Sequence, residues 1–72
     1  MEIQQRISKY IDKHGIKKTY VAEKAGLTFS RFSFIINNRS ELKADEFAKI
    51  CDALDVSPLE FMSEKESEER SF

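Results

Sequence analysis

The sequence predicts a small all-α domain of five helices, and three observations favour this fold class. Only two Gly and one Pro interrupt the 72 residues, of which 35% are charged, and this composition suits helices better than sheets. Apolar residues recur at intervals of three and four, the spacing of one helix face. Residues typical of helix starts and helix ends separate these apolar stretches. A chain of this length forms one domain with a modest core.

The first expected helix ends at about residue 13. Ile3, Ile7 and Ile11 repeat every four residues and form one stripe along it. Gly15 follows closely, and glycine takes the left-handed conformation after a helix end without strain. The stripe therefore predicts one helix of about three turns.

The next two helices are short and lie on either side of a tight turn. Val21, Ala22 and Ala25 form the apolar face of the second helix, and Gly26 ends it. Thr28 can cap the third helix, because its hydroxyl can accept a hydrogen bond from a free N–H of the first turn. The residues of the third helix expected to point inward are Phe32, Ile35 and Ile36.

Two more helices are expected after a polar loop at residues 39–43. The apolar face of the fourth helix, at about residues 44–54, consists of Phe47, Ile50, Cys51 and Leu54. Ser57, Pro58 and Glu60 then supply a cap, a proline at the first helical position and a glutamate at the third. These signals predict the start of a fifth helix. Its side chains available for the core or a dimer contact are Leu59, Phe61 and Met62.

The second and third helices together predict a helix-turn-helix at about residues 18–37. Ala22 stands four residues before Gly26, and its small side chain lets the two helices approach closely. Phe32 can pack into the same contact. Such packing holds the third helix at a fixed angle, so that its outer face can enter the major groove of DNA.

Most of the chain, about residues 3–62, resembles the Cro/C1-type (Xre, lambda-repressor-like) helix-turn-helix family. The strongest elements are AEKAGL at 22–27, SRFSFIIN at 30–37 and ALDVS at 53–57. The resemblance implies a compact five-helix lambda-repressor-like bundle that binds operator DNA, usually as a homodimer. It also implies that residues 1–62 are the DNA-binding domain.

The resemblance further implies which side chains meet double-stranded DNA. The base-facing positions are Thr28, Phe29, Ser30, Ser33 and Phe34, and Arg31 near the same edge could reach a base or a phosphate. The phosphate-facing positions are Lys18, Asn37 and Arg39, with Lys17 as an additional cation. Phosphate contacts fix the register and supply salt-sensitive affinity, whereas side chains in the groove supply sequence preference.

Two of the base-facing positions depart from the family pattern. The family usually has Gln where Phe29 stands and a polar or basic residue where Phe34 stands. Phenylalanine cannot hydrogen-bond a base edge, although it can touch a thymine methyl group. Three interpretations stay open: the rings pack into the core, contact DNA, or face a protein. In the last case they would form an exposed patch with Ile36, which replaces the usual Glu.

The net charge of −1 hides an uneven distribution of charge. Residues 1–43 carry nine Lys and Arg against four acids, a net charge of +5, and residues 44–72 carry three against nine, a net charge of −6. The expected helix-turn-helix lies in the basic half, as phosphate binding requires. Residues 63–72 are polar and acidic, and we expect them to form a disordered tail.

The remaining composition argues against an enzyme. No set of His, Cys and carboxylates has nucleophile–base or metal-ligand spacing, and no Gly-rich phosphate loop is present, so neither cofactor nor metal is expected. Cys51 cannot form an intramolecular disulfide and is expected to be a small buried hydrophobe. With no recognisable signal peptide or membrane span, the sequence predicts a cytoplasmic protein.

Two functions follow from these observations. The first is a transcriptional regulator of phage or bacterial repressor type, which places its third helix on an operator. The alternative is a protein-binding module on the same scaffold, such as an antirepressor or a small phage inhibitor, which would use the patch of Phe29, Phe34 and Ile36.

Overall fold

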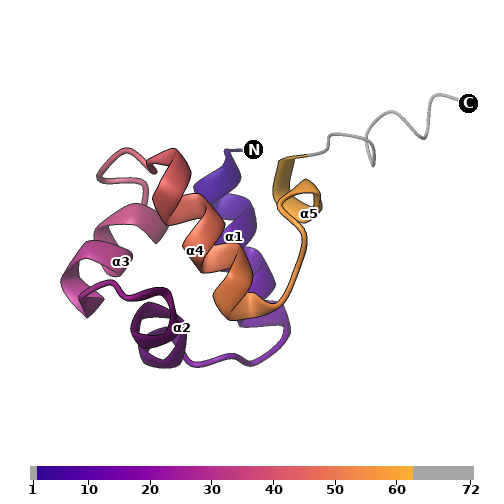
Figure 1. Cartoon of the computed structure of the whole chain (residues 1–72), viewed down its shortest axis with the longest axis horizontal. Coiled ribbons are helices and arrows are strands. Elements are labelled where there is room, and N and C mark those ends of the chain that lie inside the picture. Colours follow the sequence, from indigo (N-terminus) through magenta and orange to yellow (C-terminus); the bar gives the residue numbers. More distant parts are fainter. Residues whose placement is uncertain (1, 63–72) are drawn as a thin grey trace, which may run out of the picture.

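A computed structural model describes residues 2–62 of the chain (Figure 1). Within this range it consists of five helices and contains no strand, and the predicted all-α class is confirmed. The helices are α1 (Ile3–Lys13), α2 (Lys18–Ala25), α3 (Phe29–Ile36), α4 (Ala44–Leu54) and α5 (Leu59–Met62). The expected acidic tail at 63–72 lies outside the described residues.

Local interactions close the first helix at both ends, and it ends at Lys13, as the sequence predicts. The backbone N–H of Glu2 donates to Oε1 of Gln5 at 2.9 Å, which closes the first turn of α1. Gly15 follows the helix with a φ of 64°, the left-handed conformation expected of it. The N–H of Ile16 then donates to the carbonyl of Ile11 at 3.0 Å, and the chain turns toward α2.

The fourth helix ends differently from the first two, since no glycine closes it. Asp55 stands after Leu54 with a φ of 61°, and the N–H of Val56 donates to the carbonyl of Cys51 at 3.0 Å. Aspartate tolerates this conformation better than most residues. The fifth helix then begins as predicted, because the Ser57 hydroxyl accepts from the N–H of Leu59 at 3.2 Å.

The core is shared by all five helices. Its largest fully buried side chains are Phe32, Phe61, Ile7, Ile11, Ile35, Ile50, Val21 and Cys51. Cys51 is therefore a buried hydrophobe as predicted, and burial raises the pKa of its thiol. Burial of this apolar surface is the main force that holds such short helices together.

The fifth helix is fixed to the first. Phe61 packs edge-on against Tyr10, with 5.5 Å between ring centres, and its carbonyl accepts a 2.8 Å hydrogen bond from Nη1 of Arg6. The other two apolar side chains of α5 point outward, with Leu59 66% and Met62 51% exposed. Their use in a dimer contact stays a prediction.

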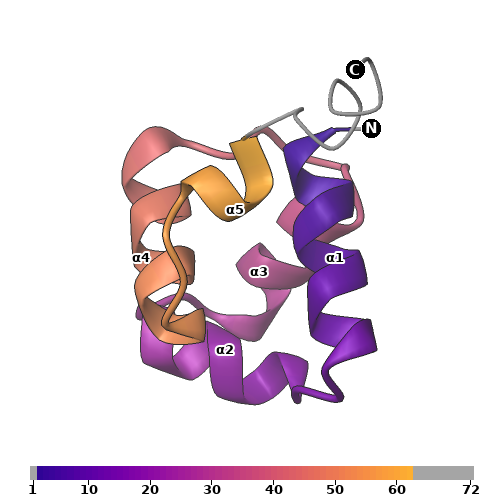
Figure 2. The ribbon, with the colours of Figure 1, turned by 90° about the vertical axis from the view of Figure 1, so that its right-hand side faces the viewer.

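The arrangement leaves α3 at the surface. Figure 1 places α3 and α5 on opposite sides of the domain, with α1 and α4 between them. In the perpendicular view of Figure 2, α5 lies in front and α3 behind, while α2 crosses below. One face of α3 is therefore directed away from the core.

Candidate nucleic-acid interface

A three-residue turn joins α2 to α3 and completes the predicted helix-turn-helix. Gly26 ends α2 with a φ of 75°, and its N–H faces the carbonyls of Ala22 and Glu23. The N–H of Leu27 donates to the Ala22 carbonyl at 2.9 Å. The Thr28 hydroxyl then accepts from the backbone N–H of Arg31 at 3.1 Å, so the predicted cap is confirmed.

The inner face of α3 is fixed in the core. Phe32 and Ile35 are fully buried and Ile36 is 5% exposed, as the sequence predicts for all three. Phe32 belongs to the same buried cluster as Ala22 and Ala25 of α2. These contacts set the angle between the two helices, which is the requirement for presenting the outer face of α3 to a partner.

The outer face of α3 carries two exposed aromatic rings. Phe29 is 49% and Phe34 52% exposed, so the interpretation that they pack into the core is wrong. Phe34 comes from a position that points away from the buried triplet on a helix of 3.6 residues per turn, whereas Phe29 lies at the border of the buried side, in the first turn of the helix. The expectation that Ile36 belongs to an exposed apolar patch is also wrong. Ile36 is buried among the core residues and cannot be part of an exposed surface.

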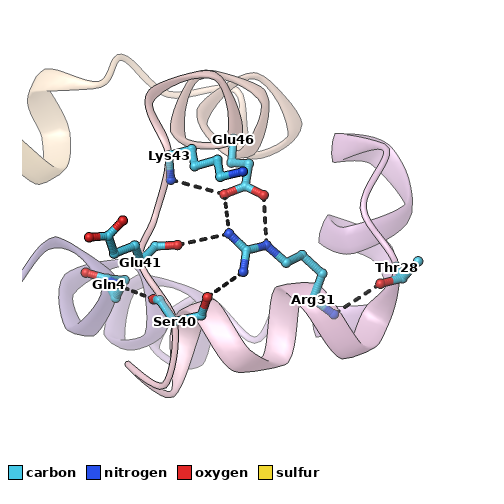
Figure 3. Close-up of polar contacts among 7 residues, drawn as sticks. All are labelled: Gln4, Thr28, Arg31, Ser40, Glu41, Lys43 and Glu46. Atoms are coloured by element: carbon cyan, nitrogen blue, oxygen red, sulfur yellow. Dashed lines mark hydrogen bonds and ion pairs between the residues drawn. The ribbon is translucent and has the colours of Figure 1, made fainter.

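Arg31 turns away from the outer face and toward α4 (Figure 3). Its Nε and Nη2 atoms donate to the two carboxylate oxygens of Glu46, both at 2.8 Å. The guanidinium also donates to the Ser40 hydroxyl and, at 3.0 Å, to the Glu41 carbonyl. This placement differs from the expectation that Arg31 could reach a base or a phosphate, because intramolecular acceptors occupy all three guanidinium nitrogens.

The contact between Arg31 and Glu46 also shifts the pKa values of both groups. Hydrogen bonding from Arg31, helped by the backbone N–H of Lys43 at 3.0 Å, lowers the pKa of the Glu46 carboxyl from 4.5 to about 2. Partial burial opposes this shift but does not outweigh it. The same hydrogen bonds raise the pKa of Arg31, so both groups stay charged near neutral pH.

The three hydroxyl groups at the base-facing positions differ in the hydrogen bonds that they form. The oxygen of Thr28 is used in capping α3, and the Ser33 hydroxyl accepts from Nδ2 of Asn37 at 3.2 Å. Ser30 is exposed in the first turn of α3. All three lie on or at the start of the helix whose outer face is exposed, and their contact with bases stays a prediction.

The predicted phosphate-binding side chains lie at the two ends of the helix-turn-helix. At the start of α2, Lys17 is exposed, and Nζ of Lys18 lies 3.6 Å from a carboxylate oxygen of Asp12. Both members of that pair are well exposed, so water and salt screen it and a phosphate can compete for the lysine.

After α3, the side chains of Asn37 and Arg39 are exposed in the loop. Within residues 2–62, no carboxylate forms an ion pair with Arg39. The Arg39 backbone N–H donates to the Phe34 carbonyl at 2.8 Å, which fixes the start of the loop beside α3. Arg39 is thus a cation held next to the outer face, although its contact with phosphate is untested.

Sequence reasoning missed Glu46 as the partner of Arg31. The two residues are 15 positions apart and lie on different helices, so no local spacing relates them. One signal was present: Glu46 stands at the third position of α4, where a carboxylate reaches back to the N–H before the helix. That role places the carboxylate at the α4 end that faces α3.

Other kinds of site receive no support from the described part of the chain. Residues 2–62 contain no group of three or more His, Cys, Asp or Glu side chains placed to hold a metal ion. None of their helices is both long enough and apolar enough to cross a membrane.

Comparison with known families agrees with this geometry. Residues 6–65 match the model of the Cro/C1-type HTH DNA-binding domain family. No curated protein and no solved structure shows significant similarity to the chain. The match includes α2, the turn and α3 entirely, together with α4 and α5. The chain therefore belongs to the Cro/C1-type helix-turn-helix family of DNA-binding domains.

Proposed function

We propose that the protein is a sequence-specific transcriptional regulator of phage or bacterial repressor type. It occupies an operator by placing α3 in the major groove and so blocks transcription. The observation that carries this proposal is the two-sided construction of α3. Its inner residues are buried, while Phe29, Ser30 and Phe34 are exposed on a helix with an exposed cation, Arg39, just beyond its end.

The proposed regulator acts in the cytoplasm as a homodimer. Two copies would set their third helices into successive major grooves about 34–36 Å apart, on a two-fold symmetric site. Exposed Leu59 and Met62 on α5 offer apolar surface for the contact between copies. The proposed activity is binding alone, without catalysis or a cofactor.

Individual residues have distinct roles in the proposed complex. Lys17, Lys18, Asn37 and Arg39 meet phosphates and supply affinity that is independent of sequence. The base-facing set is Thr28, Phe29, Ser30, Ser33 and Phe34. Arg31 acts indirectly, because its guanidinium joins α3 to α4 and to the loop before α4.

The exposure of Phe29 and Phe34 favours one further candidate function, a protein-binding module. In that case the rings would form the centre of an interface with another protein, as aromatic side chains often do. The two candidates differ in their response to salt. DNA binding weakens steeply as salt rises, whereas an interface centred on two phenyl rings is comparatively insensitive.

Selection from a random pool of double-stranded DNA at roughly physiological salt tests the proposed function. The wild-type protein is compared with Lys18→Ala/Arg39→Ala, and circular dichroism establishes that both proteins are folded. We expect the wild type to enrich one two-fold symmetric motif and the double variant to lose this enrichment.

Failure of a folded wild-type protein to enrich any motif would contradict operator binding. The protein-binding module would then be the better account of Phe29 and Phe34. Enrichment of a motif without two-fold symmetry would support sequence-specific DNA binding but contradict binding as a homodimer.

A further inference from the structure

On α3, two serine hydroxyl groups lie between two exposed aromatic rings. At 100° per residue, Phe29 and Phe34 lie about 140° apart around the helix axis, with Ser30 and Ser33 between them. Both rings are about half exposed. The helix thus presents two phenyl rings on either side of a narrow strip of hydroxyl groups.

This helix lacks the free groups that usually recognise guanine or adenine. Guanine is read mainly by Arg or Lys, and adenine by Asn or Gln. The sequence of α3, FSRFSFII, includes only one of these residue types, Arg31, and its guanidinium is bound to Glu46, Ser40 and Glu41. Serine and threonine hydroxyls bond to several bases and discriminate poorly. The side chains on α3 left to discriminate are therefore apolar.

The setting of Phe34 suits duplex DNA better than an apolar partner. The hollow beside it, with a volume of about 450 Å³, is lined by Ser33, Phe34, Asn37 and Arg39. A hydroxyl, an amide and a guanidinium therefore surround one side of the ring. This combination matches a base edge with its neighbouring phosphate, because the ring can meet the base while Arg39 meets the negative charge.

We propose that Phe29 and Phe34 determine the sequence preference of this domain by contact with the 5-methyl groups of thymines in the major groove. This inference rests on the proposed operator binding and specifies what the operator contains. Each half-site presents thymine methyl groups at two separated positions, one for each ring, and the domain reads them without a hydrogen bond from either residue.

Replacement of thymine by uracil in the DNA tests this inference directly. Uracil lacks only the methyl group and keeps the same base pairing, so any loss of affinity belongs to that group. In the duplex enriched from the random pool, each thymine of the half-site is replaced singly by deoxyuridine, and the dissociation constant is measured at fixed salt. We expect a weakening of about threefold to fivefold at the contacted thymines. We expect no change at flanking thymines.

Variants of the protein then assign each methyl group to a ring. Phe34→Ala should weaken binding to the thymine duplex and remove the difference between thymine and uracil at one position, and Phe29→Ala should do so at another. Phe34→Leu, which keeps an apolar side chain, should restore part of that difference. Lys49→Ala is the control, because this exposed lysine of α4 lies outside the helix-turn-helix and its loss should leave the thymine preference unchanged.

The outcomes separate this inference from the proposed function. An enriched site whose affinity is indifferent to uracil overturns the inference and leaves operator binding intact. A thymine preference that persists in both Phe29→Ala and Phe34→Ala overturns it as well. A folded wild-type protein that binds no duplex selectively overturns both proposals, and the two rings are then the centre of a protein interface.

Discussion

Arg31 of α3 and Glu46 of α4 form a paired hydrogen bond in which each carboxylate oxygen accepts from a different guanidinium nitrogen, both at 2.8 Å. The side chain of Glu46 is only 11% exposed and that of Arg31 29%. Because Glu46 also accepts from the backbone N–H of Lys43, the contact fixes α3, α4 and the loop between them together. A residue that the sequence suggested for DNA is thus used to hold α3 in place.

Replacing Glu46 by glutamine should lower the free energy of unfolding at pH 7 by about 1–3 kcal/mol. The variant keeps the size of the side chain but loses charge-assisted hydrogen bonds to Arg31, which are stronger than neutral ones. Denaturant unfolding followed by circular dichroism measures the difference. Glu41→Gln is the matched control, since the Glu41 side chain is exposed and only its backbone carbonyl contacts Arg31. Equal stabilities of Glu46→Gln and the control would contradict a stabilising contact.

The same contact should make stability fall in acid. The folded-state pKa of Glu46 is about 2, below its ordinary value of 4.5, so the carboxylate stabilises the fold fully above pH 4.5. This contribution is lost as the pH falls from 4.5 toward 2. The stability difference between wild type and Glu46→Gln should therefore shrink over that range, as measured by denaturant unfolding at several pH values. A difference independent of pH would show that the carboxylate charge is not responsible.

Loss of an aromatic ring should reduce stability strongly on the inner face of α3 and only slightly on its outer face. Phe32 is fully buried, so Phe32→Ala should cost about 3–5 kcal/mol and unfold much of a domain this small. Phe34→Ala should change stability by about 0.5 kcal/mol or less, because that ring is half exposed. Thermal melts of both variants check this contrast. A large loss of stability in Phe34→Ala would mean that its ring packs against the domain.

Loss of the cations at the two ends of the helix-turn-helix should weaken DNA binding on every sequence. Arg39→Ala should lower affinity for specific and random duplexes alike and reduce the slope of log affinity against log salt by about 1. Lys18→Ala should behave similarly once its exposed pairing with Asp12 is displaced by phosphate. The matched control is Lys49→Ala, an exposed lysine of α4 outside the helix-turn-helix. If the control weakened binding as much as Arg39→Ala, the effect would reflect overall charge alone.

The helix bounds were largely predictable because they depend on local signals. Gly15 and Gly26 take the left-handed conformation that ends α1 and α2, and Thr28 and Ser57 cap the helices that follow them. Asp55 was not predictable in the same way. It adopts a left-handed φ, which aspartate takes much less often than glycine, so the residue type alone is a weak signal for this helix end.

The candidate interface was less predictable, because it depends on contacts between distant residues. The sequence left open whether Phe29 and Phe34 are buried, since a helical period does not say how wide the buried stripe is. For Ile36, the inward expectation was confirmed and the exposed patch was wrong, because this residue lies beside Phe32 on the buried side of the helix. Arg31 could be placed only once α4 brought Glu46 to it.

The central claim, that α3 is the element that meets DNA, is tested most directly by nuclear magnetic resonance. The ¹⁵N-labelled protein is titrated with the duplex enriched from the random pool, and backbone amide shifts are followed along the chain. The account predicts that the largest changes fall on residues 28–39 and at the start of α2, with little change in α5 beyond any effect of dimer formation. Changes concentrated on α5, with α3 unaffected at saturation, would contradict it.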